Sequence, residues 1–329
     1  MFRPTIYGRK IMKKNKEHVL VTGGAGFIGS HLVDVLLSKN YYVTVYDNLS
    51  SKFEKNRLEH IFSNKNFNFK FGDILDLSNL SLAMKSVDKV FHLAANADIR
   101  GGIIDNNVDV QQNIIGTHNV CEACRLNKVK EIVFTSSAAV YGEPSIFPTP
   151  ESYPLIQTSL YGASKASGES IIQAYSEYFG IKTTSFRFVS WIGERYSHGV
   201  IFDFVNLLKE TPNKLEILGN GFQTKSYLHV DDGIRAMFLY LDSSSDKKGI
   251  VNIGHIEYLT VFELSDIVID EMGLKEVTIV PQISKRGWVG DNPFVHLDIS
   301  KIKNLGFVPE ISIEEGIRRT VRYLLLNSG

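Results

Sequence analysis

Tyr161 and Lys165 stand four residues apart in "SLYGASK" (residues 159–165), and both side chains can take part in proton transfer. On a helix, residues four apart lie on one face. A helix is predicted here because apolar residues recur downstream at a spacing of three to four: Ile171, Ile172, Tyr175, Tyr178 and Phe179. The pair falls at the edge of that apolar stripe and so leans toward the protein body. Taken alone, this spacing is more often structural than catalytic.

A glycine cluster follows an apolar strand in "HVLVTGGAGFIGSHLVDVLL". Gly23, Gly26 and Gly29 are spaced three apart, and Gly24, Gly26 and Gly29 also fit the pattern GxGxxG. Glycine permits a sharp turn, a close approach of the backbone to a pyrophosphate and tight packing of the next helix on the strand. The start of that helix offers free N–H groups to an anion. The stretch therefore predicts a dinucleotide-binding loop.

Asp47 ends the next predicted strand, "VTVYDN". A carboxylate at this place accepts hydrogen bonds from the ribose hydroxyls of an adenosine and repels a 2′-phosphate. No arginine stands immediately beside Asp47 in the sequence to bind such a phosphate. The pattern favours NAD over NADP as the cofactor.

The chain of 329 residues alternates short β-rich runs with helical stretches in its first half. This alternation predicts an α/β fold with a Rossmann-type, doubly wound parallel sheet. The later runs "TTSFRFV" and "GIVNIGH" could extend the sheet, and a smaller C-terminal α/β region is expected to bind substrate. The expected division is a flexible leader (1–17), a cofactor domain (18–186, with a return near 225–255) and a substrate domain (187–224 and 256–329).

Two hydroxyls end another predicted strand in "EIVFTSSAAVYGEP". The carboxyl ends of strands in a doubly wound sheet line the ligand crevice. Ser136 and Ser137 are therefore expected near the nicotinamide of a bound cofactor.

These motifs, in this order, resemble the extended short-chain dehydrogenase/reductases, in particular their NAD-dependent nucleotide-sugar epimerase/dehydratase branch. The resemblance runs from "VLVTGGAGFIGSH" through "GDILD", "VFHLAA", "TSSAAVYG", "YGASK" and "YLHVDD" to "LDISKIKNLGFVP". It implies that Ser137, Tyr161 and Lys165 are catalytic. Ser137 would bind the reacting sugar oxygen, and Lys165 would also hold the nicotinamide ribose.

The expected acid–base group is the phenol of Tyr161, whose pKa in free tyrosine is about 10. The Lys165 ammonium and the positive nicotinamide would favour the phenolate and bring this pKa toward neutral. Tyr161 could then take a proton from a sugar hydroxyl while hydride leaves the same carbon.

The resemblance also implies a set of cofactor contacts that includes the glycine loop and the ends of the next strands. The expected cofactor-binding residues are Gly23, Gly26, Phe27, Ile28, Gly29, Asp47, Asn48, Asp73, Ile74, Leu93, Ala94, Ala95, Tyr161 and Lys165.

Ala138 and Ala139 distinguish between reactions within the family. Similar 4,6-dehydratases carry an Asp–Glu pair there, and decarboxylases carry Glu at the second position. A methyl group can act as neither acid nor base, so the resemblance favours a 4-epimerase of the UDP-glucose/UDP-galactose kind. The alternatives are a 4-ketosugar-nucleotide reductase, a dehydratase-like relative, or a non-catalytic NAD(H)-binding sensor or scaffold.

The substrate side departs from the family pattern. Ser190 stands where an asparagine is usual, Lys225 where arginine is usual, and Trp288 where an arginine is expected, with Arg286 close by. The small Val295 falls at the family's sugar-size gate, so an N-acetylated sugar could fit. The expected substrate-binding residues are Ser190, Val200, Lys225, Arg286, Asp291 and Val295.

The net charge of the chain bears on which kinds of partner the protein could bind. The formal net charge is zero, which favours neither a nucleic-acid partner nor an anionic membrane.

Cys121 and Cys124 form "CEAC" within an apparent helix and are expected to be packed thiols in the cytoplasm. His229, Asp231 and Asp232 in "YLHVDD" are expected to cap a helix rather than bind a metal. A homodimer is expected by analogy, through helices that contain "QQNIIGTHNVCEACRL" and "YGASKASGESIIQAYSEYFG".

Overall fold

A computed structural model gives the fold of residues 16–50 and 55–327. Its largest element is a seven-stranded sheet in which every neighbouring pair of strands is parallel. The strands lie in the order β11 (Lys248–Ile253), β6 (Lys182–Phe188), β5 (Glu131–Thr135), β4 (Lys89–His92), β1 (His18–Thr22), β2 (Tyr42–Asp47) and β3 (Phe67–Phe71).

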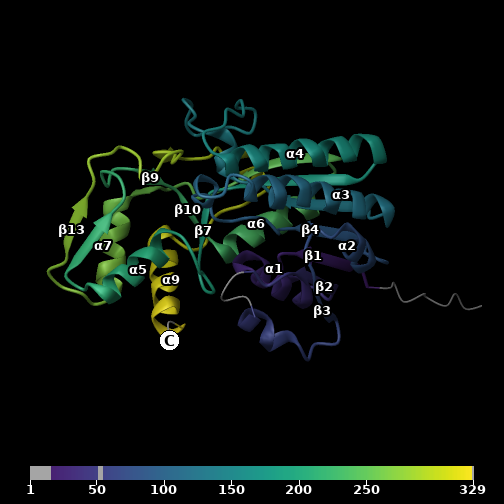
Figure 1. The fold of residues 1–329 in the computed structure, drawn as a ribbon, viewed down its shortest axis with the longest axis horizontal. Coiled ribbons are helices and arrows are strands. Elements are labelled where there is room, and N and C mark those ends of the chain that lie inside the picture. The colour runs from purple at the N-terminus through teal and green to yellow at the C-terminus, as the bar shows by residue number, and fades with distance from the viewer. Residues whose placement is uncertain (1–15, 51–54, 328–329) are drawn as a thin grey trace, which may run out of the picture.

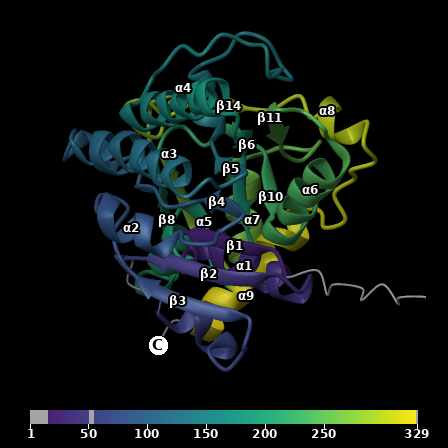
Figure 2. The same cartoon turned by 90° about the vertical axis from the view of Figure 1, so that its right-hand side faces the viewer.

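Helices cover both faces of this sheet. Cys121, Cys124 and Ile172 belong to one buried apolar cluster with Leu20 and Val90 of the strands. Figure 2 shows α2, α3 and α4 on that side and α6 on the other. The covering helices are α1 (Phe27–Ser38), α2 (Leu77–Ala83), α3 (Gly116–Leu126), α4 (Leu160–Phe179) and α6 (Val230–Ser243).

Short helical turns complete the loops at the carboxyl ends of the strands. They are η1 (Lys55–Ile61), η2 (Gly101–Ile103), the π-helical segment η3 (Val110–Ile115) and η4 (Ala138–Tyr141). Segment η3 runs directly into α3, so the two form one continuous helical stretch.

A smaller region, at the left of Figure 1, lies beyond the sheet and contains α5, α7 and α9. Its helices are α5 (Val200–Glu210), α7 (Val261–Glu271) and α9 (Ile313–Asn327), with the short α8 (Ser300–Lys303) near β11. Its strands pair as β7 (Ser190–Ile192) with β10 (Tyr227–His229), β8 (Lys214–Ile217) with β13 (Thr278–Pro281), and β9 (Thr224–Lys225) with both β12 (Leu259–Thr260) and β14 (Phe294–Val295).

The strand order reverses beside β1, which lies between β2 and β4. The chain extends the sheet on one side through β2 and β3, then crosses to the other side for β4, β5 and β6. In an open α/β sheet, ligands bind at the carboxyl ends of the strands at such a switch point.

The predicted α/β fold with a doubly wound parallel sheet is confirmed, including its extension by β6 and β11. The division into two domains stays a prediction, although β11 pairs with the large sheet as the proposed return would require. The leader expected over residues 1–17 falls almost entirely outside the described residues.

Cys121 and Cys124 lie fully buried in α3 as free thiols, and burial raises the pKa of both. The Sγ of Cys124 lies 3.8 Å from the Sδ of Met84 on α2. The structure therefore confirms that both cysteines are thiols packed in the core. Within the described chain, none of the helices combines the length and apolar character needed to cross a membrane.

A buried ion pair ties α4 to the sheet. The Arg187 guanidinium of β6 donates two hydrogen bonds to the Glu169 carboxylate of α4, at 2.9 and 2.7 Å, and each side chain is at most 3% exposed. Arg187 also donates to the Tyr141 hydroxyl at 2.9 Å, and Tyr141 donates to Asn252 Oδ1 of β11 at 2.7 Å. A buried charge of this kind is stable only while its partner is present.

We predict that Glu169→Ala lowers the free energy of unfolding by about 3–5 kcal/mol, because it leaves the Arg187 charge buried without its partner. Denaturant unfolding followed by circular dichroism measures the change. Glu177→Ala is the control: it breaks a pair with Lys248 near the other end of the same helix, where both side chains are largely exposed, and little change is expected. Equal losses in the two variants would contradict the prediction.

Candidate active site

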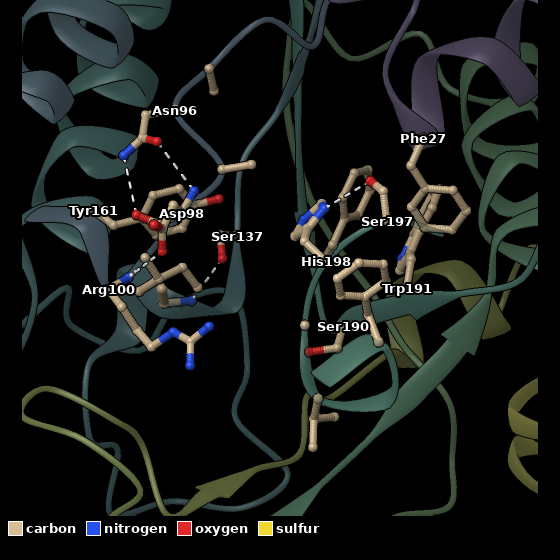
Figure 3. A pocket seen from close by; sticks show the side chains of 18 of the residues that line it. Phe27, Asn96, Asp98, Arg100, Ser137, Tyr161, Ser190, Trp191, Ser197 and His198 are labelled. Atoms are coloured by element: carbon tan, nitrogen blue, oxygen red, sulfur yellow. Dashed lines mark hydrogen bonds between the residues drawn. The ribbon is translucent and has the colours of Figure 1, made fainter. Parts of the chain in front are cut away.

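A cleft of about 1500 Å³ opens at the carboxyl ends of β1, β4 and β5. Its wall combines the glycine loop, the segment after β5, the start of α4 and several segments of the smaller region. Figure 3 shows Tyr161 and Ser137 on one side of this cleft and Ser190 and Trp191 on the other. The residues predicted from separate motifs therefore meet around one space.

The glycine loop turns sharply where β1 ends. Gly23 has a φ of +69°, a conformation that glycine adopts readily, and its N–H donates to Tyr46 O on β2 at 3.1 Å. A Cβ on Gly23 would lie 2.6 Å from the backbone nitrogen of Ala94 after β4. A Cβ on Gly29 would lie 2.2 Å from Gly23 O. Both contacts leave no room for a side chain.

Helix α1 begins directly after this turn, with Gly26 as its N-cap and no side-chain cap. Its first N–H groups therefore have no side-chain acceptor from the capping residue. This arrangement fits the pyrophosphate of a dinucleotide, which the free N–H groups and the positive end of the helix dipole would hold.

Asp47 lies at the end of β2 and is 6% exposed. Its two oxygens accept hydrogen bonds from the backbone N–H groups of Ala25 and Leu49, each at 2.9 Å. Burial raises the pKa of its carboxyl group, while these two hydrogen bonds oppose the rise. Asp47 thus braces the glycine loop in addition to facing the cleft.

Arg57 corrects one part of the sequence argument. No arginine adjoins Asp47 in the chain, but the fold brings the Arg57 guanidinium of η1 near the Asp47 carboxylate, where its charge lowers the carboxyl pKa. Arg57 is buried, lines the cleft and donates to Ala25 O at 3.3 Å. Because Arg57 lies ten residues after Asp47 in the sequence, the residues next to Asp47 gave no indication that an arginine would lie near it.

Most of the predicted cofactor-binding residues lie on the wall of the cleft: Gly23, Gly26, Phe27, Ile28, Gly29, Asp47, Asn48, Ile74, Leu93, Ala94, Ala95, Tyr161 and Lys165. Asp73 is not among the lining residues. Its carboxylate instead accepts a hydrogen bond from Asn48 Nδ2 at 2.9 Å. Asp73 therefore holds the side chain of Asn48, which lines the cleft, without lining the cleft itself.

Ser159 starts the helix that carries Tyr161 and Lys165. Its hydroxyl accepts the N–H of Gly162 at 3.0 Å, which is an N-cap contact. In the first turns of α4, the Lys165 Nζ donates to Thr135 O at the end of β5, at 3.0 Å, and lies 5.9 Å from the centre of the Tyr161 ring. Helix geometry therefore brings both side chains to the strand end that bears the serines.

The structure separates the two candidate serines. The Ser137 hydroxyl lies near that of Tyr161, where it lowers the tyrosine pKa, and it accepts the backbone N–H of Ala139 at 3.1 Å. Ser136 instead donates to Glu169 Oε1 at 2.5 Å and is buried. The hydroxyl beside the phenol is that of Ser137, the serine that the family resemblance singles out.

The pKa of Tyr161 differs from the sequence expectation. Burial raises it to about 12 and outweighs the opposing effect of Ser137. Burial also lowers the pKa of Lys165 to about 8, while the charges of Asp109 and Glu169 oppose that change. The protein side chains alone do not bring Tyr161 toward neutral, so that part of the expectation depended on the positive nicotinamide.

The neighbouring strand end supplies no further base. His92 of β4 is fully buried between Thr22 Oγ1 and Thr117 Oγ1, at 2.8 and 2.9 Å. Burial lowers its pKa to about 3, so the imidazole is neutral. A neutral imidazole held between two threonines packs the core beside the cleft.

On the substrate side, Ser190, Val200, Lys225, Asp291 and Val295 all line the cleft. Lys225 Nζ donates to Asp291 Oδ1 at 2.7 Å and to Asn292 O. The structure does not bring Arg286 to the cleft wall: its guanidinium contacts Glu143, and Trp288 lines the cleft instead.

The segment between β7 and α5 adds residues that the sequence motifs did not indicate. Ser197 and His198 line the cleft opposite Tyr161 (Figure 3). The ring of Tyr196 contacts the Phe27 ring of the glycine-loop helix edge-on, with centroids 5.5 Å apart. This segment links the start of α1 to the smaller region.

His229 acts as a helix cap, as predicted. Its Nδ1 accepts the N–H of Asp231 at 3.2 Å at the start of α6. Glu194, His229 and Asp231 lie close enough to hold a metal ion. However, Arg319 already places a positive charge 2.8 Å from Glu194, which favours a structural ion-pair cluster.

Comparisons with known proteins agree with this geometry. A putative UDP-glucose 4-epimerase from Methanocaldococcus jannaschii is 36% identical over 94% of this chain and 99% of its own length. A crystal structure of a UDP-galactose 4-epimerase superposes with a TM-score of 0.82 at 35% identity, covering 94% of this chain and 99% of the other.

A second structure carries the cofactor. The dTDP-glucose 4,6-dehydratase DesIV from Streptomyces venezuelae, solved with NAD bound, has a TM-score of 0.88 and 31% identity, covering 95% of this chain and 98% of the other. Residues 19–254 match the family model described as "NAD dependent epimerase/dehydratase family". The chain therefore belongs to the NAD-dependent epimerase/dehydratase family, the extended short-chain dehydrogenase/reductases that act on nucleotide sugars.

Proposed function

We propose that this protein is an NAD-dependent nucleotide-sugar 4-epimerase that interconverts sugars of the UDP-glucose/UDP-galactose kind. The observation that carries the proposal is the grouping of Ser137, Tyr161 and Lys165 at the cleft beside two alanines. The epimerases among the related proteins support the same assignment.

The glycine loop supports NAD binding, because its close backbone contacts leave no room for side chains at the turn before α1, where a pyrophosphate would approach the backbone. In this assignment Gly23, Gly26 and Gly29 hold the pyrophosphate and Asp47 receives the adenosine ribose. NAD, when bound, supplies the acceptor and donor for the hydride of the sugar C4. Because hydride is returned to the sugar, no net oxidation of the substrate occurs.

The chain's own residues would move the proton. As a phenolate, Tyr161 takes the proton of the sugar 4-hydroxyl. It returns a proton after the 4-ketopyranose has turned its other face toward the nicotinamide. Ser137 binds the reacting oxygen, since its hydroxyl lies beside the phenol and lowers the pKa of Tyr161. The Lys165 ammonium, fixed by Thr135 O, stabilises the phenolate by its charge.

Ala138 and Ala139 argue against elimination of water. Both lie on the cleft wall in the turn η4 that follows Ser137. Their methyl groups offer neither the acid nor the base that dehydration across C5 and C6 requires. A dehydratase-like reaction is therefore the weaker alternative, although a dehydratase is among the similar structures.

The proposal places the enzyme in the cytoplasm, where the unpaired thiols of Cys121 and Cys124 stay reduced. It also includes a homodimer, because α3 and α4 carry exposed apolar side chains: Leu126, Tyr178 and Phe179. Light scattering coupled to size-exclusion chromatography measures the mass, and a monomer across the working concentration range would contradict the dimer.

The function is tested by incubating the purified, NAD-loaded protein with UDP-, dTDP-, GDP- and ADP-sugars and analysing the products by NMR. We expect a C4 epimer from a UDP-sugar without net consumption of cofactor. UDP-N-acetylglucosamine belongs in the panel because Val295 is small. A 4-keto-6-deoxy product would indicate a dehydratase, and stoichiometric NADPH consumption with a ketosugar would indicate a reductase. Released NAD with no product from any sugar would favour a non-catalytic binder.

We predict that Tyr161→Phe lowers kcat by about 10²–10⁴-fold, the usual contribution of a general acid–base group, while bound NAD is retained. Initial rates of epimerisation and the NAD released on denaturation measure the two effects. Tyr258→Phe removes a hydroxyl from a side chain that is 51% exposed and does not line the cleft, so it serves as the control. A Tyr161→Phe variant as active as the control would remove Tyr161 from the mechanism.

We predict that Gly29→Ala causes loss of most bound NAD, because the new methyl group would overlap Gly23 O and Gly24 Cα at the pyrophosphate turn. NAD released from the denatured protein is quantified against the wild type. Gly180→Ala, at the end of α4, is the control: its methyl group meets no atom within 4 Å, and the strain from its φ of +74° falls on the helix end rather than on the glycine loop. Full NAD content in Gly29→Ala would show that the loop tolerates a side chain.

A further inference from the structure

Asp109 is a buried carboxylate close to the catalytic pair that the proposed mechanism does not use. It is 1% exposed and lies at the start of η3, the π-helical segment that packs on α4. Its charge acts on both Tyr161 and Lys165. A buried carboxylate at such a place is costly unless its environment stabilises it.

One oxygen of Asp109 is held by two amides. Asp109 Oδ1 accepts hydrogen bonds from Asn96 Nδ2 at 2.9 Å and from Asn113 Nδ2 at 3.2 Å. The other oxygen, Oδ2, is buried and has no hydrogen-bond partner within the part of the chain that the structure describes. Gly102 closes over it, since a Cβ there would lie 2.8 Å from Oδ2.

Asn113 connects this carboxylate to the catalytic turn of α4. Its Nδ2 also donates to Ser164 Oγ at 2.9 Å, and Ser164 Oγ donates to Tyr161 O at 2.8 Å. Ser164 lies between Tyr161 and Lys165, so the chain of contacts from Asp109 ends on the turn that carries both.

Asn96 connects the carboxylate to the loop that borders the cleft. Asn96 N donates to Asn113 Oδ1 at 2.7 Å, and its side chain exchanges hydrogen bonds with the backbone of Asp98. Asp98 Oδ1 accepts the N–H of Arg100 at 3.0 Å. The Arg100 side chain then reaches across to Asp203 of α5 at 3.4 Å. Figure 3 shows Asn96, Asp98 and Arg100 beside Tyr161.

The charges that face the catalytic pair come from several elements. On α4 itself, Glu169 faces Lys165 but is paired with Arg187 of β6. From β4, His92 is buried and neutral, and β5 contributes the carbonyl of Thr135. From the loop after β4, Asp98 acts on Asp109 rather than on the pair. Burial raises the pKa of the Asp109 carboxyl group, while the hydrogen bond from Asn96 and the charge of Lys165 oppose that rise. Asp109 is thus a carboxylate that acts on both members of the pair, and the positive charge that acts on it is that of Lys165.

We propose that Asp109 is a positioning residue that sets the charge state of the Tyr161–Lys165 pair and seats the loop of residues 96–100 against it. The inference rests on the proposed catalytic roles of these two residues. The negative charge of Asp109 holds the proton on the Lys165 ammonium and on the Tyr161 phenol. The phenolate therefore forms when the positive cofactor is present rather than in the empty cleft.

The test titrates Tyr161 directly in the NAD-loaded protein. The ultraviolet absorbance of phenolate is followed against pH in wild type and in Asp109→Asn, each after subtraction of the matching Tyr161→Phe protein. Removing the negative charge is expected to shift the appearance of the phenolate to lower pH. Both limbs of the pH profile of kcat are expected to move in the same direction, since Tyr161 and Lys165 both lose a charge that favours their protonated forms.

Three further variants separate charge from packing. Asp232→Asn removes another buried carboxylate, which holds the N–H groups of Glu310 and Ile311, and it should leave the titration unchanged. Asn96→Ala keeps the Asp109 charge and should raise KM while the phenolate appears near its wild-type pH. Asp109→Ser, a smaller side chain, gives the same comparison as Asp109→Asn if the latter does not fold.

An unchanged Tyr161 titration in folded Asp109→Asn or Asp109→Ser would overturn the inference, and so would an equal shift in Asp232→Asn. The absorbance reports on the phenol itself. Failure to epimerise any sugar would therefore overturn the proposed function while this measurement would still decide the role of Asp109.

Discussion

The site depends on one constraint of the sheet: β1 and β4 are adjacent parallel strands whose carboxyl ends face the same side. The N–H of Leu93 donates to Thr22 O at 3.1 Å, so the chain beyond β4 continues beside the glycine turn. Gly23 and Ala94 approach so closely there that no side chain fits between them. The glycine turn, the segment that bears Ser136 and Ser137 and the start of α4 line the same cleft beside this contact.

Polar contacts across the buried face of α4 hold the catalytic turn on that framework. Lys165 reaches Thr135 O, and Ser136 reaches Glu169, which in turn is paired with Arg187. Inside a protein such contacts are strong when complete and costly when a partner is missing. The interior around the acid–base pair is thus ordered by hydrogen bonds and ion pairs as much as by apolar packing.

The sequence was sufficient where function follows from a local pattern. The glycine loop and Asp47 could be predicted because each depends on a strand followed by a short turn or helix, whereas the roles of Ser137 and Tyr161 were assigned from the family resemblance. Arg57 and Asp109 could not be predicted, since only the fold brings Arg57 to the cleft wall and the Asp109 carboxylate near Tyr161. Arg286 was expected at the cleft, but the irregular segment around it has no periodicity, and the wall is formed by Trp288. The direction of the pKa shift of Tyr161 could not be predicted from the sequence either, because its largest cause is burial, which depends on the whole fold.

The ion pair between Lys225 and Asp291 has a consequence for how the cleft would bind and release a phosphate. The lysine ammonium is already neutralised by a carboxylate 2.7 Å away, inside the wall. Under the proposed function, a substrate phosphate at this lysine would compete with that carboxylate, so the affinity gained would be the difference between two ionic contacts. Once the phosphate had left, Asp291 would again neutralise Lys225, so neither charge would be left without a partner.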